Sequence, residues 1–235
     1  MKTTIAKFRI TRRLAVSWAA IFFLSAVAFG AQTSADATQF EPDIQAFEQN
    51  DKTNPPPANA ILFIGSSSIR LWKTLAQDFP DHRVINRGFG GSQISDSVLF
   101  AERVVIPYRP RMIVFYAGGN DLNAGKAPTE VFGDWQNFVH KVQAKLPATR
   151  IAYISSAPNP ARWAQVEQVK ELNNLIAAYQ KQDSRRAFID VFSQMLGADG
   201  RPRPEIFSDD RLHMNPEGYR LWTQIVKPHL TPAAH

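Results

Sequence analysis

Short apolar runs and longer amphipathic stretches alternate along most of the chain. The apolar runs cover 60–64, 84–85, 112–116, 151–154 and 188–191, with Asp190 inside the last. Such runs are typical of strands that are buried on both faces of a sheet. The stretches with helical spacing of apolar residues cover 69–78, 95–106, 129–146, 163–182 and 216–226.

Alternating strands and helices at this spacing predict right-handed βαβ units. We therefore expect an α/β fold, a three-layer α/β/α sandwich with a mostly parallel five-stranded sheet. Before the first strand, the pattern predicts a polar lead-in over 31–40 and a short helix over about 42–50, ended by the prolines at 55–57. Reactive residues of such folds lie where strands end and helices begin, at the carboxyl edge of the sheet.

The first 30 residues have the pattern of an export signal. They carry five Lys and Arg and no acidic residue, and Leu14 to Gly30 is an apolar run interrupted only by Ser17 and Ser25. Ala28-Phe29-Gly30 approximates the small-x-small cleavage pattern. We expect cleavage there and export to the periplasm or the medium, with Arg12-Arg13 leaving both the Sec and the twin-arginine route open. A retained membrane anchor is the alternative, because about 17–25 apolar residues span a bilayer.

Removal of this segment changes the charge of the protein. The whole chain has a net charge of +6, whereas the remainder has 22 Lys and Arg against 21 Asp and Glu. The basic balance therefore does not indicate a nucleic-acid partner, and no stable membrane insertion is expected after cleavage. The chain has no cysteine, which excludes disulfides and thiolate sites. We expect the lead-in and helix over 31–58 and one domain over 59–231; the sequence does not predict an oligomeric state.

Four segments at the predicted strand ends, or before the last helix, carry small or polar residues. They are Gly-Ser-Ser-Ser at 65–68, Asn-Arg-Gly-Phe-Gly-Gly-Ser at 86–92, Gly-Gly-Asn-Asp at 118–121 and Ser-Asp-Asp-Arg-Leu-His-Met-Asn at 208–215. Each has a structural explanation when taken alone, since serines cap helices and Gly, Asn and Asp favour turns. His82, His140, His229 and His235 have no such context and are expected to be structural or surface residues.

Together the four segments fit the chemistry of a serine hydrolase. A serine nucleophile needs a histidine base, a carboxylate that orients the base, and N–H donors for the oxyanion. Ser67 would stand at a strand-to-helix junction, and Asp210 and His213 are three residues apart, so that a short turn can bring them together. The glycines at 88–91 leave backbone N–H groups accessible, and the Asn120 amide can donate a further hydrogen bond.

The four blocks, in this order, resemble the SGNH hydrolase superfamily, the GDSL-like esterases and lipases, over about 61–230. The resemblance implies a flavodoxin-like SGNH fold and assigns Ser67, His213 and Asp210 to the catalytic triad. It implies an oxyanion hole formed by Ser67, Gly91 and Asn120. The sequences at 65–72 and 86–91 are similar to a bacterial subgroup allied to platelet-activating-factor acetylhydrolase-like esterases.

One position departs from the family pattern. Ser66 stands where the name-giving Asp is usual, which puts the local hydrogen bonding in doubt but not the triad. Asp209 is a second candidate for the carboxylate, although the spacing to His213 favours Asp210. A metal site at Asp209, Asp210 and His213 is a minor alternative, because no further ligand converges there. The glycines at 88–91 match neither the dinucleotide fingerprint nor a P-loop, so that no cofactor is predicted.

The sequence therefore predicts an exported serine esterase, a carboxylic ester hydrolase. The resemblance implies short, acetyl-type acyl groups on a small acylated substrate such as a carbohydrate ester. A lysophospholipase or thioesterase acting on longer acyl chains is one alternative, and a catalytically silent polysaccharide-binding protein of the same fold is another. Trp72, Phe89, Tyr116 and Trp163 could line a substrate surface or belong to the core.

Overall fold

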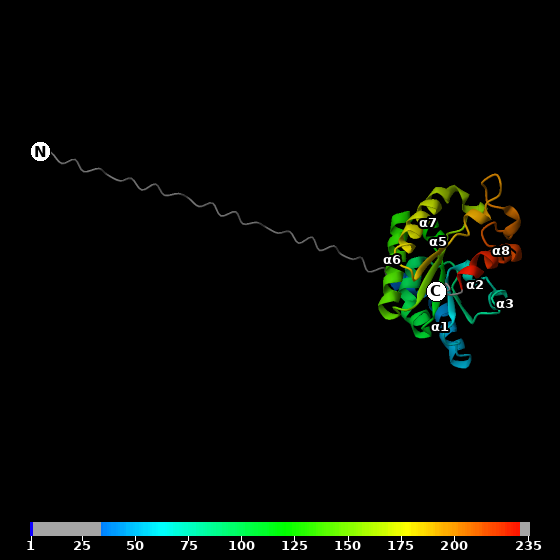
Figure 1. Ribbon diagram of the computed structural model, residues 1–235, viewed down its shortest axis with the longest axis horizontal. Helices are drawn as coiled ribbons and strands as arrows, with labels where there is room; N and C mark the ends of the chain where they lie inside the picture. Colours follow the sequence, from blue (N-terminus) through cyan, green and yellow to red (C-terminus); the bar gives the residue numbers. More distant parts are fainter. Residues whose placement is uncertain (2–33, 231–235) are drawn as a thin grey trace. The chain divides into compact units, whose positions relative to one another are not determined.

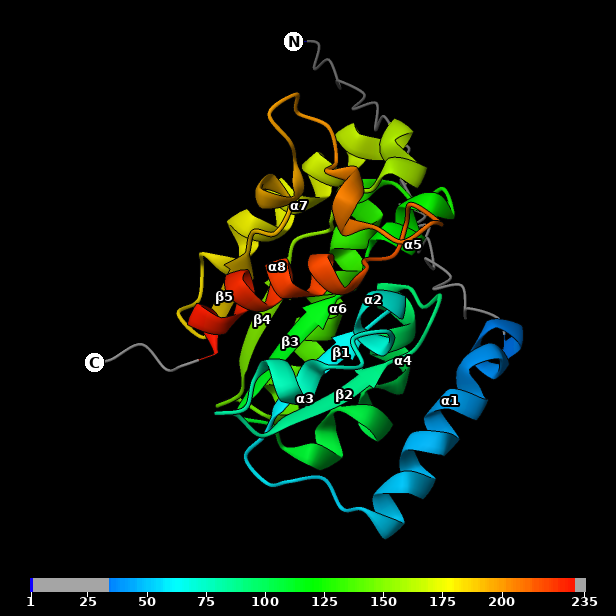
Figure 2. The ribbon, with the colours of Figure 1, turned by 90° about the vertical axis from the view of Figure 1, so that its right-hand side faces the viewer.

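The computed structural model describes Met1 and residues 34–230, so that most of the predicted export signal lies outside the described residues. Five strands form one sheet in the order β2-β1-β3-β4-β5, and every neighbouring pair is parallel (Figure 2). They are β1 (Ile61–Gly65), β2 (Val84–Gly88), β3 (Met112–Tyr116), β4 (Arg150–Ile154) and β5 (Arg186–Ile189). The predicted α/β fold is confirmed, with a sheet that is wholly parallel.

Helices cover both faces of this sheet. The α-helices are α1 (Ser34–Thr53), α2 (Ser67–Arg70), α3 (Leu75–Asp78), α4 (Ile94–Val104), α5 (Gly119–Asn123), α6 (Pro128–Lys145), α7 (Val166–Gln180) and α8 (Pro216–Val226). Short 3-10 turns are η1 (Ile106–Tyr108), η2 (Pro160–Gln165), η3 (Ser193–Met195), η4 (Pro204–Ile206) and η5 (Lys227–His229). None of the described helices has the length and apolar composition needed to cross a membrane.

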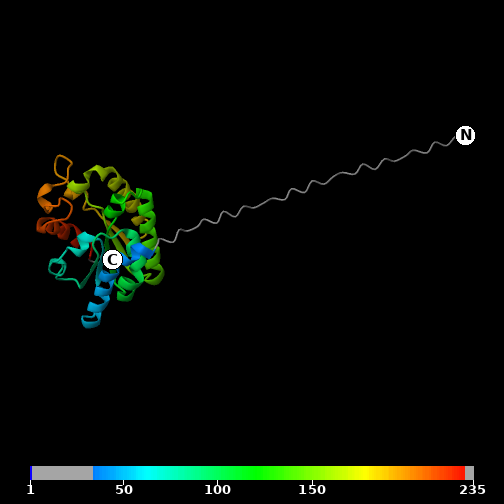
Figure 3. The same cartoon turned by 180° about the vertical axis from the view of Figure 1, so that it is seen from behind.

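Successive side chains of each strand point to opposite faces and so enter two separate cores. Leu62 and Ile64 of β1 pack with α1, α4, α6 and α7, whereas Ile61 and Phe63 pack with α2, α3 and α8. Figure 1 shows α6 and α7 on one side of the sheet and α2, α3 and α8 on the other, and Figure 3 shows the same arrangement from behind. The long apolar runs in the sequence follow from this arrangement, because both faces of every central strand are covered.

Helix α1 is longer than the sequence predicts. The expected polar lead-in over 31–40 is wrong from Ser34 onward, where the helix begins, and Pro42 lies inside it. Phe40 packs edge-to-face on Phe89, with ring centroids 5.2 Å apart, and Arg103 of α4 forms ion pairs with two glutamates of α1, Glu41 and Glu48, at 2.7 Å each. These contacts lie on both sides of Pro42, and they stabilise the helix on either side of the missing N–H.

The single helix predicted over 69–78 is also wrong, because α2 and α3 are separate short helices. Between them the chain turns so that Trp72 enters the second core, where it is 1% exposed. Its indole N–H donates to Asp78 Oδ2 at 2.6 Å, and the Thr74 hydroxyl donates to the same oxygen at 2.7 Å. Burial of a tryptophan with its N–H satisfied outweighs one continuous helical turn.

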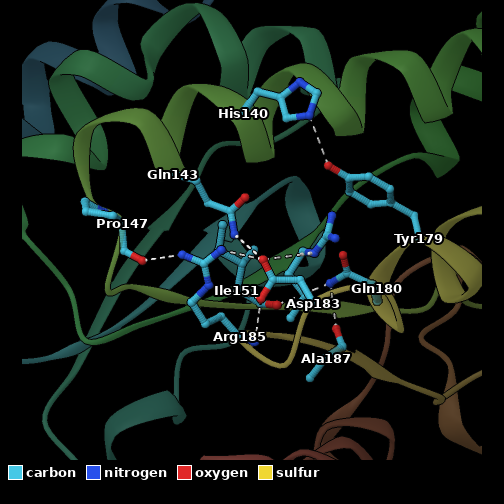
Figure 4. Close-up of polar contacts among 10 residues, drawn as sticks. His140, Gln143, Pro147, Ile151, Tyr179, Gln180, Asp183, Arg185 and Ala187 are labelled. Carbon is cyan, nitrogen blue, oxygen red and sulfur yellow. Dashed lines mark hydrogen bonds and ion pairs between the residues drawn. The ribbon is translucent and has the colours of Figure 1, made fainter.

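At the amino edge of the sheet, polar side chains join α6, α7 and β5 (Figure 4). Asp183 accepts hydrogen bonds from Arg185 and from Gln143, and Gln180 donates to the carbonyls of Ile151 and Ala187. His140 lies 3.3 Å from the Tyr179 hydroxyl, as expected for a structural histidine. This edge is opposite to the one that carries the four candidate segments.

Candidate active site

Ser67 is the first residue of α2, directly after the tight turn that ends β1. Gly65 has φ of +138°, and a Cβ there would lie 1.8 Å from the carbonyl oxygen of Tyr116, so that only glycine fits. The N-cap of α2 is Ser66, whose side chain makes no capping hydrogen bond. The Ser67 hydroxyl does not cap the helix either, because it lies 2.8 Å from Nε2 of His213. The capping explanation for these serines therefore does not hold.

His213 lies between Ser67 and Asp210. Its Nδ1 is 2.6 Å from Asp210 Oδ2, while Asp210 Oδ1 accepts the backbone N–H groups of Leu212 and His213, both at 2.9 Å. An ionised carboxylate can only accept, so that Nδ1 carries the hydrogen of this bond and Nε2 of the neutral ring is free to accept from Ser67. The three residues form one continuous chain of hydrogen bonds.

The carboxylate of Asp210 also shapes the loop that carries His213. This loop is a turn rather than helix-like backbone, and Arg211 adopts a left-handed φ of +56° within it. The backbone N–H of His213 is the main cause that lowers the pKa of Asp210 to about 2, which keeps it ionised near neutral pH. Asp209, the second candidate from the sequence, makes no hydrogen bond or ion pair with His213 among the described contacts.

The predicted oxyanion donors converge on the same edge of the sheet. Ser67 begins α2, and no described residue accepts its backbone N–H, as is usual in the first turn of a helix. Gly91 has φ of +85°, and a Cβ there would meet open space. Asn120 lies in α5 rather than in a simple turn, and its Nδ2 donates to the Ser92 carbonyl at 3.1 Å. The Asn120 side chain is thereby bonded to the loop that contains Gly91.

A small cavity of about 40 Å³ opens beside Ser67 and Asn120, and Gly91 is not among the residues that line it. Its lining includes Ser67, Asn120, Arg162, His213, Tyr116 and Trp222. A wider open groove of about 620 Å³ lies along α8, lined among others by Leu71, Thr74, Asp210, His213 and Tyr219. His213 and Met214 border both the small cavity and the large groove.

The aromatic candidates divide between core and site. Trp72 and Phe89 are buried in the core, Tyr116 lines the small cavity, and Trp163 lies beneath the Arg201 guanidinium at 5.4 Å. His82 contacts Arg111, whereas His235 is outside the described residues. Between positions 34 and 230, no three His, Asp or Glu side chains gather into a metal-ligand cluster.

Arg162 is a site residue that the sequence reasoning missed. Its Nη1 donates to Asn120 Oδ1 at 3.0 Å and to the Gly119 carbonyl at 3.1 Å. It follows Pro158-Asn159-Pro160, after β4, at the carboxyl edge of the sheet. The rule that reactive residues follow strand ends could have found it, but no family block covers this loop.

Asp121 joins the Asn120 loop to α4. Its side chain is fully buried, and Oδ1 accepts the backbone N–H of Ile94, the first residue of α4, at 3.0 Å. Lys126 Nζ is 3.9 Å from the same oxygen, and Oδ2 has no hydrogen-bond partner within the described part of the chain. Burial raises the pKa of Asp121 to about 6.

Comparison with known proteins identifies the family of the chain. Residues 65–221 match the model of a family described as GDSL-like Lipase/Acylhydrolase. A protein from Streptococcus pneumonia, provisionally described as a platelet activating factor, is 20% identical with a TM-score of 0.73, covering 83% of this chain and 94% of that one. A GDSL-like lipase from Bacteroides thetaiotaomicron is 20% identical, with a TM-score of 0.68 and coverages of 80% and 96%.

An acetyl xylan esterase is also similar, at 20% identity and a TM-score of 0.60, covering 73% of this chain and 99% of that one. At these identities the solved structures show a shared fold. No curated protein matches the chain.

The raised pKa of Asp121 predicts a pH-dependent stability that Asp121→Asn removes. An acid whose pKa is about 6 in the folded protein, against its ordinary value of 3.8, favours folding below pH 4 and loses that contribution as the pH rises through 6. Since one pKa unit corresponds to about 1.4 kcal/mol, the loss approaches roughly 3 kcal/mol by pH 7. The asparagine keeps an oxygen that can accept from Ile94.

Urea unfolding of both proteins between pH 4 and pH 7 measures this difference. As the pH rises from 4 to 7, the free energy of unfolding of the wild type should decrease relative to that of the variant. Parallel curves for the two proteins would show that Asp121 titrates normally.

Proposed function

Because the chain belongs to the GDSL-like lipase/acylhydrolase family, we propose that it is a serine esterase that hydrolyses short-chain, acetyl-type carboxylic esters. The observation that carries this proposal is the hydrogen-bond chain from Asp210 through His213 to Ser67, at 2.6 and 2.8 Å. Such a chain supplies a nucleophile, a base and the group that orients the base. No cofactor takes part in the proposed reaction.

In the proposed mechanism, His213 Nε2 takes the proton of the Ser67 hydroxyl as Oγ attacks the ester carbonyl carbon. The Ser67 and Gly91 N–H groups and Asn120 Nδ2–H donate to the oxyanion that forms. His213, now protonated and paired with Asp210, gives its proton to the departing alcohol oxygen. A water molecule then attacks the acyl group on Ser67, with the same base and the same donors, and releases the carboxylic acid.

The neighbouring serines do not have the contacts of a nucleophile. Ser66 is 6% exposed, and its N–H donates to the Tyr116 carbonyl at 3.0 Å as part of the turn. Ser68 is 8% exposed, and its carbonyl accepts the Tyr219 hydroxyl at 2.9 Å. Among the described contacts, His213 bonds to Ser67 alone of the three. This supports Ser67 as the attacking residue despite the serine in place of the usual Asp at 66.

The small cavity supports a preference for short acyl groups. A single water needs a cavity of roughly 10–15 Å³, so that a cavity of about 40 Å³ accommodates a group of about acetyl size. The wider groove, which His213 also borders, has room for a larger alcohol such as a sugar. The fold shared with an acetyl xylan esterase agrees with this assignment.

Replacement of the nucleophile tests the reaction itself. Ser67→Ala should lower kcat for p-nitrophenyl acetate by roughly 10⁴-fold or more, because the variant has no group to form the acyl-enzyme. Ser193→Ala, the same change at a surface serine that bonds Asp190, is the control and should retain full activity. If folded Ser67→Ala turned over the ester at the wild-type rate, Ser67 would not be the nucleophile and the proposal would be refuted. If the wild type neither turned over the ester nor reacted with a fluorophosphonate, the result would favour a binding protein.

A series of p-nitrophenyl esters from acetyl to decanoyl tests the acyl preference. The value of kcat/KM should be highest for acetyl or propanoyl and fall by about tenfold or more for long chains, because each surplus methylene must displace packed side chains. An optimum at long chains would instead favour a lysophospholipase or thioesterase with the same catalytic residues. Acetylated glycans, assayed in parallel by acetate release, test the proposed alcohol.

We further propose that the protein is exported after removal of residues 1–30. The support is the basic segment followed by a 17-residue apolar run, which lies outside the described structure. Because α1 begins at Ser34, a cut after Gly30 would leave the first helix whole. The intact mass of protein recovered outside the cytoplasm should correspond to a chain that begins near Ala31. Full-length protein retained in the membrane fraction would instead identify an anchor.

A further inference from the structure

Arg162 is a half-buried cation without an acidic partner. It lines the small cavity beside Ser67, and no carboxylate among residues 34–230 lies within ion-pair distance of its guanidinium. Charged side chains that are withdrawn from water are normally paired. Burial lowers the pKa of Arg162, although an arginine remains charged throughout the neutral range. The charge therefore needs an explanation other than an ion pair.

The backbone holds Arg162 in a defined position. Asn159 Oδ1 accepts the Arg162 backbone N–H at 2.9 Å, and the Ala161 N–H donates to the Arg211 carbonyl at 3.0 Å. Arg162 has φ of −121° and ψ of 26°, which departs from the turn of η2 around it. The η2 segment is thus tied directly to the loop that carries Asp210 and His213.

The contacts of Arg162 determine which way the Asn120 amide faces. Arg162 Nη1 donates to Oδ1 at 3.0 Å, and Nδ2 donates to the Ser92 carbonyl at 3.1 Å. A flipped amide would place its NH₂ against the guanidinium and its oxygen against that carbonyl, so that both hydrogen bonds would be lost. The observed orientation leaves the second Nδ2 hydrogen for another acceptor, because an amide nitrogen has two.

We propose that Arg162 is a positioning residue for the oxyanion hole: it fixes Asn120 as a donor, and its unpaired charge strengthens that donor when the oxyanion forms. The inference rests on the proposed esterase function. A cation bonded to Oδ1 polarises the amide, and hydrogen bonds in a chain reinforce one another. The negative charge that would balance Arg162 then appears only in the transition state, which is where electrostatic stabilisation accelerates a reaction.

Three variants test the proposal with p-nitrophenyl acetate. Arg162→Met should lower kcat by about 10- to 100-fold and change KM by less than about threefold, because an uncharged acetyl ester does not bind to the arginine in the ground state. Arg162→Lys retains a positive charge and N–H donors, although not the planar fork of the guanidinium, and it should recover part of kcat. Arg201→Met, which removes an exposed arginine stacked on Trp163, is the matched control and should leave kcat unchanged.

A double-mutant cycle separates positioning from a general loss of structure. Asn120→Ala should lower kcat by about 10²- to 10³-fold, and adding Arg162→Met to it should cause little further loss, since the two residues act as one unit. Fully additive losses would mean that Arg162 does not act through Asn120. Comparison with Arg162→Lys keeps the test valid if Arg162→Met folds poorly.

Two further outcomes overturn the inference in distinct ways. An unchanged kcat in Arg162→Met, with a wild type that depends on Ser67, refutes the positioning role and leaves the esterase intact. An unchanged kcat with a KM that rises only for esters bearing a carboxylate, such as a succinyl ester, would make Arg162 a residue for substrate recognition. A wild type without esterase activity would refute the proposed function itself, whatever the Arg162 variants show.

Discussion

Ser67 and His213 are separated by 146 positions in the sequence, yet their side chains meet at 2.8 Å. Ser67 is fixed by the end of β1, while His213 lies in the loop before α8, so the hydrogen bond depends on how α8 packs against α2. The Tyr219 hydroxyl donates to the Ser68 carbonyl at 2.9 Å, and Trp72 and Trp222 pack edge-to-face with centroids 5.9 Å apart. The aromatic packing of the second core thereby holds the base at hydrogen-bond distance from the nucleophile.

Charge in the site is distributed over groups with different tasks. Two backbone N–H groups stabilise Asp210 as an anion, and its carboxylate orients the imidazole of His213. Asp121 is buried with an elevated pKa and joins the Asn120 loop to α4, and Arg162 brings a cation that no carboxylate in the described chain balances. The two loops that would hold the oxyanion are thus bonded to each other and to a positive charge. Such a preorganised arrangement needs little rearrangement when negative charge develops.

Much of this architecture follows from the sequence alone, and the exceptions have physical causes. The strand Met112–Tyr116 and the helix Pro216–Val226 have the predicted bounds, because an uninterrupted apolar run and an N-terminal proline are strong local signals. The break between α2 and α3 depends on the burial of Trp72, and the extension of α1 depends on Arg103, a residue far away in the sequence. Neither contact can be derived from local periodicity.

The site, too, contains residues that the sequence predicts and one that only the structure reveals. The sequence predicts Ser67, Asp210 and His213 because they belong to blocks of recognisable residue types, and the structure brings the three together. Arg162 lies in a loop with no such pattern, and its position becomes evident only from its bonds to Asn120 and Gly119.

The central claim is that Ser67 becomes acylated, and trapping that intermediate tests it most directly. Protein mixed with p-nitrophenyl acetate, quenched in acid within the first turnover and digested, should yield a peptide containing Ser67 that is heavier by one acetyl group. Fragmentation should place the group on Ser67 and not on Ser66 or Ser68, and His213→Ala should abolish the signal. Ester turnover with the acetyl group on another residue, or with no acetylated peptide in the wild type or in a variant with slowed deacylation, would contradict the account.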